Sequence, residues 1–322
     1  MGSDKGAGRI RRLTNSGLCW YDAGERYAIR IGTPVAKGWN VSKWMGRAGG
    51  FDPQFDDTQW TDGWLYVPIA QVPPGRHESG YLVERRALHH AEVFGKVYQL
   101  ATPLWCRLLY DPSGRLWMSD TPQERIMMYN NGRRSRGHVL IGGLGLGLYP
   151  QYAEQGGVGQ ATRFTIIERS AVIRDIVAPT MHATLVAEVE ITTGDVAAYL
   201  ARPATVRFDT IFLDTWETLD ATHLPAINRL RNMALAHLAP DGEVLLWGYG
   251  WMTRLFEEAC NRLLSIAPGQ RREWLFSQAE TNPRAVALLE PVVNHFDGQC
   301  VDELTEALRW CRRYVLNRTQ PL

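Results

Sequence analysis

The sequence predicts an α/β protein with a doubly wound, mostly parallel sheet that carries helices on both of its faces. Short apolar runs alternate with stretches of helical period, which is the pattern of strands joined by crossover helices. The runs are apolar almost throughout, as expected of strands buried on both faces. They span residues 138–142, 163–168, 187–192, 208–214 and 242–249. A cluster of glycines directly after the first run marks the expected ligand side of this sheet.

The chain of 322 residues is long for one domain and divides into four expected segments. The sequence predicts an irregular, loop-rich module over residues 1–105 and a hairpin followed by a helix over 106–137. The sheet domain is expected over 138–265, and a group of helices over 266–322. The first segment is rich in tryptophan, and these side chains either bury apolar area or form a surface that stacks on bases or sugars. They are Trp39, Trp44, Trp60 and Trp64. Leu82, Leu88, Val93 and Val97 have the spacing of one further helix.

The second segment carries clear turn and helix signals. Residues 111–114, with the sequence DPSG, predict the turn of a β-hairpin. Thr121 predicts a helix N-cap, followed by Pro122 at the first helical position and by Glu124 as the partner residue of a capping box.

Helical patterns fill the spaces between the expected strands and continue to the end of the chain. They lie at about 147–155, 170–179, 193–201, 220–240, 251–264 and 301–318, with a loop near 294–299. The last helices bury against the rest of the chain or against a second copy, so the sequence leaves a homo-oligomer open.

Composition and charge exclude several classes of function. The net charge of +1 does not indicate a polyanionic partner, and the basic clusters RIRR and NNGRRSRGH leave nucleic acid as an open but unsupported acceptor. The apolar run from Val139 to Tyr149 is too short to span a bilayer, and the first residues lack a secretory signal. The 5 cysteines form no C-x-x-C pair, which favours a reducing, cytoplasmic location and no metal site. The adjacent His89 and His90 lack the spacing of a helical ligand pair.

The glycines after the first run predict a ligand site. Glycine allows a sharp bend and lets a ligand touch the main chain where no Cβ intervenes. The dinucleotide motif G-x-G-x-x-G fails because Leu148 stands where its third glycine would fall, and no Lys-Ser or Lys-Thr follows for a phosphate loop. The run contains Gly142, Gly143, Gly145 and Gly147.

Carboxylates follow at the ends of the next three strands. Glu168 ends the second run, where it could accept hydrogen bonds from ribose hydroxyls. Asp195 comes just after the third run, where it either accepts from an adenine amine or caps the following helix. Asp214 ends the fourth run at the same edge.

These features resemble the successive motifs of class I S-adenosylmethionine-dependent methyltransferases. The segment YDPSGRLWMSDTPQERIMMY resembles the spermidine-synthase-like branch of that fold, as found in phage and bacterial methyltransferase-like proteins. The resemblance covers about residues 108–264, and it implies a Rossmann-like fold with S-adenosylmethionine as cofactor. The cofactor contacts that it implies are Gly142, Gly143, Leu144, Gly145, Gly147, Glu168, Arg169, Asp195 and Val196.

The sequence also departs from the family pattern. Ile141 and Gly142 stand where the family has an acid before the glycines, so Asp120 is the predicted partner of the cofactor's amino group. Aminopropyltransferases of the spermidine-synthase branch have a GGGDGG loop, a hairpin glutamine and a Tyr-His pair. Here that loop lacks its aspartate, Trp117 replaces the glutamine, and no Tyr-His pair occurs.

The catalytic prediction rests on Asp214 and Glu217, with Asp220 beyond. Their D-x-x-E spacing resembles the acid pair that holds the amine in aminopropyltransferases, and a raised pKa would let one of them act as a general base. Trp216 either walls the acceptor pocket or packs in the core. The first hypothesis is methyl transfer to a small-molecule or unidentified macromolecular acceptor. Aminopropyl transfer and a non-catalytic nucleoside-binding or interaction protein are the alternatives.

Overall fold

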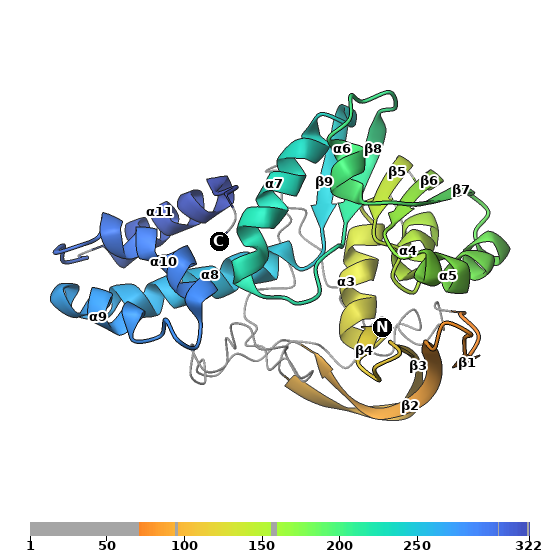
Figure 1. Ribbon diagram of the computed structural model, residues 1–322, viewed down its shortest axis with the longest axis horizontal. Coiled ribbons are helices and arrows are strands. Elements are labelled where there is room, and N and C mark those ends of the chain that lie inside the picture. The colour runs from red at the N-terminus through yellow and green to blue at the C-terminus, as the bar shows by residue number, and fades with distance from the viewer. Residues whose placement is uncertain (1–70, 94–95, 156–159, 302, 321) are drawn as a thin grey trace, which may run out of the picture.

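The computed structural model describes residues 71–93, 96–155, 160–301, 303–320 and 322. In this part of the chain a small antiparallel sheet, a parallel sheet with its helices, and a group of C-terminal helices follow one another (Figure 1). The tryptophans predicted to organise the first segment, and the RIRR cluster, lie outside the described residues.

The antiparallel sheet contains four strands in the order β1-β2-β3-β4. They are β1 (Gly75–Arg76), β2 (Leu82–Val93), β3 (Lys96–Tyr110) and β4 (Leu116–Ser119). The helix expected from the apolar spacing between Leu82 and Val97 is therefore wrong. Among the β2 residues whose burial is described, Val83 and Ala91 are buried, whereas Leu82 and Leu88 remain partly exposed. Pairing with β3 decides the structure here, because strand preference depends on cross-strand packing more than on local spacing.

The expected boundary at residue 105 falls inside β3, so residues 71–93 and 96–105 belong with the following hairpin. The turn at 111–114 is confirmed: the Asp111 carboxylate accepts from the Ser113 and Arg115 backbone N–H groups at 2.9 and 3.0 Å, and β3 pairs with β4.

Helix α3 (Pro122–Gly132) begins directly after Thr121, the predicted N-cap, but the capping box does not form. The Thr121 side chain makes no capping hydrogen bond. Glu124 instead accepts a hydrogen bond from the Trp247 indole N–H at 3.1 Å. The sequence signal thus locates the helix start correctly and misassigns the glutamate.

The second sheet confirms the expected fold class. Its strands are β5 (Gly137–Gly142), β6 (Ala161–Glu168), β7 (Glu188–Thr193), β8 (Phe208–Leu213) and β9 (Leu238–Leu246). They follow the order β7-β6-β5-β8-β9, and every neighbouring pair is parallel. The chain winds outward from β5 in one direction and then from β8 in the other. The point of reversal, where such sheets bind ligands, lies between these two strands.

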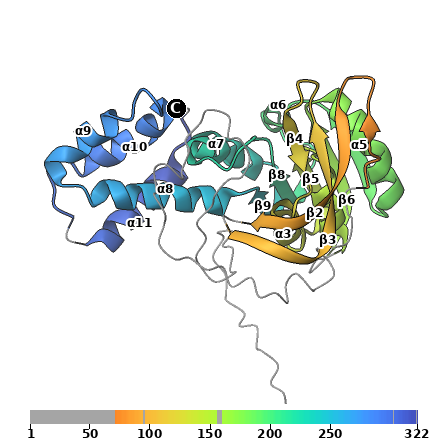
Figure 2. The same cartoon turned by 90° about the horizontal axis from the view of Figure 1, so that it is seen from below.

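Helices surround this sheet (Figures 1 and 2). They are α4 (Leu148–Gln155), α5 (Ala171–Thr184), α6 (Val196–Leu200) and α7 (Leu224–Leu235), with a short 3-10 turn η2 (Ala221–His223) before α7. α4 and α5 contact β6, and α7 contacts β9 and α6. Crossovers between parallel strands are right-handed as a rule, so a sheet wound in two directions carries the helices of its two halves on opposite faces. Phe164, Ile166 and Phe212 are almost fully buried between these layers.

The C-terminal helices extend from the end of β9. They are α8 (Tyr249–Leu264), η3 (Pro268–Gln270), α9 (Arg271–Phe276), α10 (Pro283–His295) and α11 (Leu304–Asn317). α11 packs on α7 and α8, and the Asn228 side-chain amide donates to the Val315 carbonyl at 2.7 Å. Within the described residues, no helix combines the length and apolar character needed to cross a bilayer.

Candidate functional site

The carboxyl ends of the parallel strands are joined by backbone hydrogen bonds. The Gly143 N–H donates to the Ile167 carbonyl, the Asp214 N–H to the Gly142 carbonyl, and the Gly194 N–H to the Glu168 carbonyl, each at 2.9 Å. The structure therefore brings the glycine segment, Glu168 and Asp214 to one edge of the sheet, as the sequence predicts.

Two glycines of the loop have different physical roles. Gly143 has φ +93°, and a Cβ there would meet the Asp214 carbonyl oxygen, so this position lets two chain segments approach closely. Gly145 has φ +56° and no heavy atom within 4 Å of an added Cβ. Leu144 and Leu146 on either side of it are buried and anchor the loop. The backbone at Gly145 is therefore held in place yet open to a ligand.

Glu168 lies against this loop. Its Oε2 accepts from the Leu144 N–H at 2.9 Å, and its Oε1 accepts from the Ser170 N–H at 2.8 Å. The side chain is only 7% exposed. Each carboxylate oxygen keeps a further lone pair, so both can still accept from a ligand hydroxyl. Arg169, the adjacent residue, is exposed beyond β6.

Asp195 and Val196 lie at the exit of β7. Asp195 is exposed and caps α6, because its Oδ1 accepts from the Ala198 N–H at 2.8 Å. This is the capping role considered from the sequence, and it leaves Oδ2 for other partners. Val196 is buried against the end of β5, where a Cβ on Gly142 would stand 2.9 Å from Val196 Cγ2. The Gly147 N–H closes the loop by donating to the Leu144 carbonyl at 3.0 Å.

Asp120 does not fit the role predicted for it. The side chain is 1% exposed and forms an ion pair with Arg125 Nη2 at 3.0 Å, while its other oxygen accepts from the Arg107 N–H. Burial raises the pKa of Asp120 to about 6, although Arg125 opposes that shift. The Asp120 carboxylate thus links β3 to α3 through Arg107 and Arg125, and both of its oxygens have protein partners. Its assignment to the cofactor's amino group is therefore wrong.

Asp214 and Glu217 have different surroundings. The Glu217 side chain is 61% exposed and pairs with Arg115 Nη1 at 3.5 Å. The pKa of Asp214 is raised well above its ordinary value by burial, then by the negative charges of Glu124 and Glu168. The carboxylate that acts on Asp214 from outside the sheet is therefore Glu124. In the sequence, Glu124 could be recognised only as an acid in the first turn of α3, with nothing to indicate that it lies near Asp214.

Two tryptophans complete this edge. Trp216 follows β8 and Trp247 follows β9, and their ring centroids lie 6.4 Å apart. Trp247 is buried and Trp216 partly buried. Trp216 packs against the core, which is one of the two roles considered from the sequence, and its role as a wall of the acceptor pocket stays a prediction.

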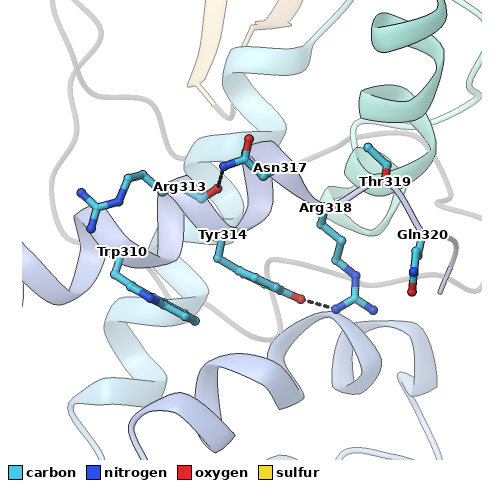
Figure 3. A pocket seen from close by; sticks show the side chains of 7 residues that line it. All are labelled: Trp310, Arg313, Tyr314, Asn317, Arg318, Thr319 and Gln320. Carbon is cyan, nitrogen blue, oxygen red and sulfur yellow. Dashed lines mark hydrogen bonds between the residues drawn. The ribbon is translucent and has the colours of Figure 1, made fainter.

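A surface hollow of about 630 Å³ lies elsewhere, along the end of α11, and is lined by Trp310, Tyr314 and polar side chains (Figure 3). Within it Arg318 donates to the Tyr314 hydroxyl. Its residues are distant in sequence from the sheet edge, and it is not the site predicted here. Among the described residues, no group of three or more His, Cys, Asp or Glu side chains could hold a metal ion.

Basic residues of the NNGRRSRGH segment have protein partners. Arg134 pairs with Glu243 at 2.7 Å, and Arg136 donates to the Asp241 carbonyl. These arginines connect the start of β5 to β9.

No family model and no curated protein matches the chain. Among solved structures it is similar to S-adenosylmethionine-dependent methyltransferases and to spermidine synthases. The Trypanosoma brucei PRMT1 enzyme–prozyme complex with AdoHcy is 15% identical over 38% of each chain, with a TM-score of 0.30. The O-methyltransferase of Bacillus cereus in complex with SAH is 26% identical over 36% of this chain and 51% of its own, with a TM-score of 0.27. The spermidine synthase of Thermotoga maritima is 14% identical over 59% of this chain and 72% of its own, with a TM-score of 0.31.

These likenesses are partial. The chain spans about half or less of the trypanosomal and Bacillus cereus proteins, at 38% and 51% of their lengths. The functional conclusion therefore depends on the contacts at the sheet edge.

Proposed function

We propose that this chain binds S-adenosylmethionine at the carboxyl edge of its parallel sheet and transfers the methyl group to an acceptor. The observation that carries the proposal is the pairing of Glu168 with the glycine loop. Its carboxylate fixes the Leu144 N–H at 2.9 Å, and the next residue, Gly145, presents open backbone. A carboxylate that can accept from sugar hydroxyls and a backbone cradle thus lie side by side, next to the point where the strand order reverses.

The proposed contacts follow from this placement. The free lone pairs of Glu168 accept from ribose hydroxyls, and the loop from Gly143 to Gly147 accommodates the amino-acid part of the cofactor. Asp195 Oδ2 accepts from the adenine amine, Val196 forms the floor of the adenine site, and Arg169 lies beside its rim.

Little chemistry is required of the chain itself. When bound, the cofactor supplies a methyl group that its sulfonium already activates. The protein residues align the acceptor with that methyl group and exclude water from it. An acceptor that is protonated at rest needs a general base, and Asp214 is the proposed group because its pKa is raised.

Calorimetric titration of the full chain tests the proposal. We expect S-adenosylmethionine and S-adenosylhomocysteine to bind with one site per chain, and a tritiated methyl group to appear in an acceptor from a panel of small molecules. Failure of both compounds to bind would refute the cofactor site and favour the non-catalytic hypothesis.

Aminopropyl transfer is a second candidate. The β3–β4 hairpin followed by α3 is the lead-in that the resemblance to the spermidine-synthase-like branch implies. Decarboxylated S-adenosylmethionine distinguishes the two reactions in the same titration. Tighter binding of the decarboxylated form supports aminopropyl transfer, and tighter binding of the carboxylated form supports methyl transfer.

A further inference from the structure

We propose that the hollow at the end of α11 is a second binding site, which takes a small aromatic anion: a planar ring that bears a carboxylate or a phosphate group. The hollow has a volume of about 630 Å³, which is the size of a small-molecule pocket. It belongs to the C-terminal helices, and α11 lies away from β5 and β6 in both views of the molecule (Figures 1 and 2). The inference is therefore independent of the cofactor site proposed above.

One side of α11 provides an aromatic wall. Trp310 and Tyr314 are one helical turn apart, so their rings lie on the same face of the helix, and Figure 3 shows Arg318 on that side as well. The two rings are nearly parallel, with centroids 5.6 Å apart and an interplanar angle of 5°. The His295 ring stacks on Trp310 at 3.7 Å and holds it in place. Both wall residues are only partly buried, so they present flat apolar surface to a planar ring.

Two arginines give the hollow a positive charge. Arg313 and Arg318 line it, and its other lining residues, all within the described chain, carry no charge. Neither arginine forms an ion pair with a carboxylate of the described chain, whereas Arg312 on the same helix pairs with Glu257 at 3.0 Å. Arg318 Nε is buried and has no hydrogen-bond partner among the described residues. An anion in the hollow would give this guanidinium the acceptor that the described chain does not supply.

Tyr314 fixes the position of the Arg318 guanidinium. Its hydroxyl donates to the Leu288 carbonyl at 3.2 Å and accepts from Arg318 Nη1. This contact uses one of the five N–H groups of the guanidinium, and the Arg318 side chain makes no other hydrogen bond within the described chain. The remaining N–H groups suit the paired oxygens of a carboxylate or a phosphate group.

The end of α11 does not use these arginines to satisfy its own backbone. Arginines near helix C-termini often bind the last carbonyl groups, whose partial negative charge attracts them. Here the Asn317 amide donates to the Arg313 carbonyl at 2.9 Å. The Asn228 amide donates to the carbonyls of Val315 and Arg318 at 2.7 and 2.9 Å. Within the described chain, side-chain amides therefore cap the helix and leave the guanidinium groups available for a ligand.

Calorimetry of the full chain at pH 7 tests the inference with four probes. 2-Naphthoate and 2-naphthyl phosphate carry a ring and an anionic group, 2-naphthol carries the ring alone, and acetate carries the anionic group alone. We expect each aromatic anion to bind about tenfold or more tightly than 2-naphthol or acetate, and its affinity to fall as salt is added. The tighter of the two aromatic anions identifies the anionic group that the site prefers.

Variants of the two arginines test the charge. Arg318→Gln should weaken naphthoate binding by about tenfold or more, because a hydrogen bond between charged groups is lost. Arg313→Gln should weaken it by about threefold, as expected of an exposed ion pair. The exposed Arg313 side chain has no partner in the described chain, so this variant should keep the melting temperature of the parent chain. Arg202→Gln makes the same change at an exposed position of the sheet domain and should bind naphthoate like the parent chain.

NMR locates the bound probe. The Trp310→Phe variant identifies the Trp310 indole N–H resonance, which naphthoate should shift in the parent chain. Saturating S-adenosylhomocysteine should leave the affinity for naphthoate unchanged, since the sheet edge is a separate site.

The outcomes distinguish the inference from the proposed function. Equal binding of 2-naphthol and 2-naphthoate, an unmoved Trp310 resonance, displacement of naphthoate by S-adenosylhomocysteine, or parent-like affinity in both Arg313→Gln and Arg318→Gln would each overturn the inference. Failure of S-adenosylhomocysteine to bind would refute the proposed function and leave the binding site on α11 intact.

Discussion

Asp120 and Asp214 are both aspartates whose pKa is raised by burial, but their surroundings are opposite. Asp120 is paired with Arg125 at 3.0 Å, so its charge is compensated inside the protein. Asp214 is crowded by Glu124 and Glu168, and no described cation offsets it. The first environment stabilises the ionised carboxylate through Arg125, whereas the neighbouring charges in the second oppose ionisation. A raised pKa alone therefore does not identify a functional site, and the sign of the neighbouring charge must be considered with it.

The two environments meet in α3. Glu124 and Arg125 are adjacent in the sequence and point to different neighbours. Arg125 donates to Asp120 and to the Trp105 carbonyl at 2.7 Å, which ties the antiparallel sheet to α3. Glu124 accepts from Trp247 at the end of β9. The buried ion pair thus fixes the helix that carries Glu124.

The largest expected effect comes from breaking the compensated pair. Asp120→Asn leaves the buried Arg125 guanidinium without its counterion, which costs about 3–5 kcal/mol of unfolding free energy. Asp214→Asn removes a crowded charge and should leave the unfolding free energy unchanged or higher. Urea denaturation of both variants measures the contrast, and equal losses would show that the two aspartates have the same structural role.

The next effect concerns the close approach of the glycine loop to Asp214. Gly143→Ala combines left-handed strain of about 1–2 kcal/mol with a clash against the Asp214 carbonyl oxygen, for which overpacking adds about 1–3 kcal/mol. Gly145→Ala has the same kind of strain without a neighbour to meet.

Denaturation curves should therefore rank Gly143→Ala as less stable than Gly145→Ala. Calorimetry should show that Gly145→Ala loses affinity for S-adenosylhomocysteine, because its methyl group fills the open side of the loop. Normal affinity in Gly145→Ala would mean that the ligand does not approach this backbone.

The sequence was sufficient for the fold and for the placement of the backbone at the site. Buried parallel strands are recorded in continuous apolar runs, and the glycine loop, Glu168 and Asp214 each end a strand, so their common edge follows from topology alone. Strand β2 could not be predicted from the spacing of its apolar residues, because pairing with β3 determines which of its side chains are buried. The partners of Asp120, Glu124 and Glu217 depended on how α3 and the hairpin pack on the sheet, which no local pattern encodes.

A smaller effect is expected where a carboxylate is satisfied by backbone groups. Glu168→Ala removes the acceptor of the Leu144 and Ser170 N–H groups and the proposed ribose partner, so affinity for S-adenosylhomocysteine should fall by about 1–3 kcal/mol. Glu190→Ala, which removes an exposed carboxylate from β7, serves as the matched control in the same calorimetric titration. Unchanged affinity in Glu168→Ala would exclude Glu168 from the cofactor site.

The smallest effect is a dependence of the unfolding free energy on pH that arises from Glu124, which has no ion-pair partner among the described residues to oppose its raised pKa. Glu124 has a pKa of about 7 in the folded chain against an ordinary value of 4.5, so the folded state binds more protons than the unfolded state between these values. Unfolding free energy contributed by this group therefore falls as pH rises from 4.5 to 7, and the loss is complete above 7. Glu124→Gln removes that slope and should be more stable than the parent chain at pH 8, by about 1 kcal/mol after allowance for solvent screening. Chemical denaturation at pH 5 and pH 8 measures the difference, with Glu280→Gln, the same change at an exposed position, as the control. A parent chain that is equally stable at both values, relative to Glu124→Gln, would show that Glu124 is solvated in the folded chain.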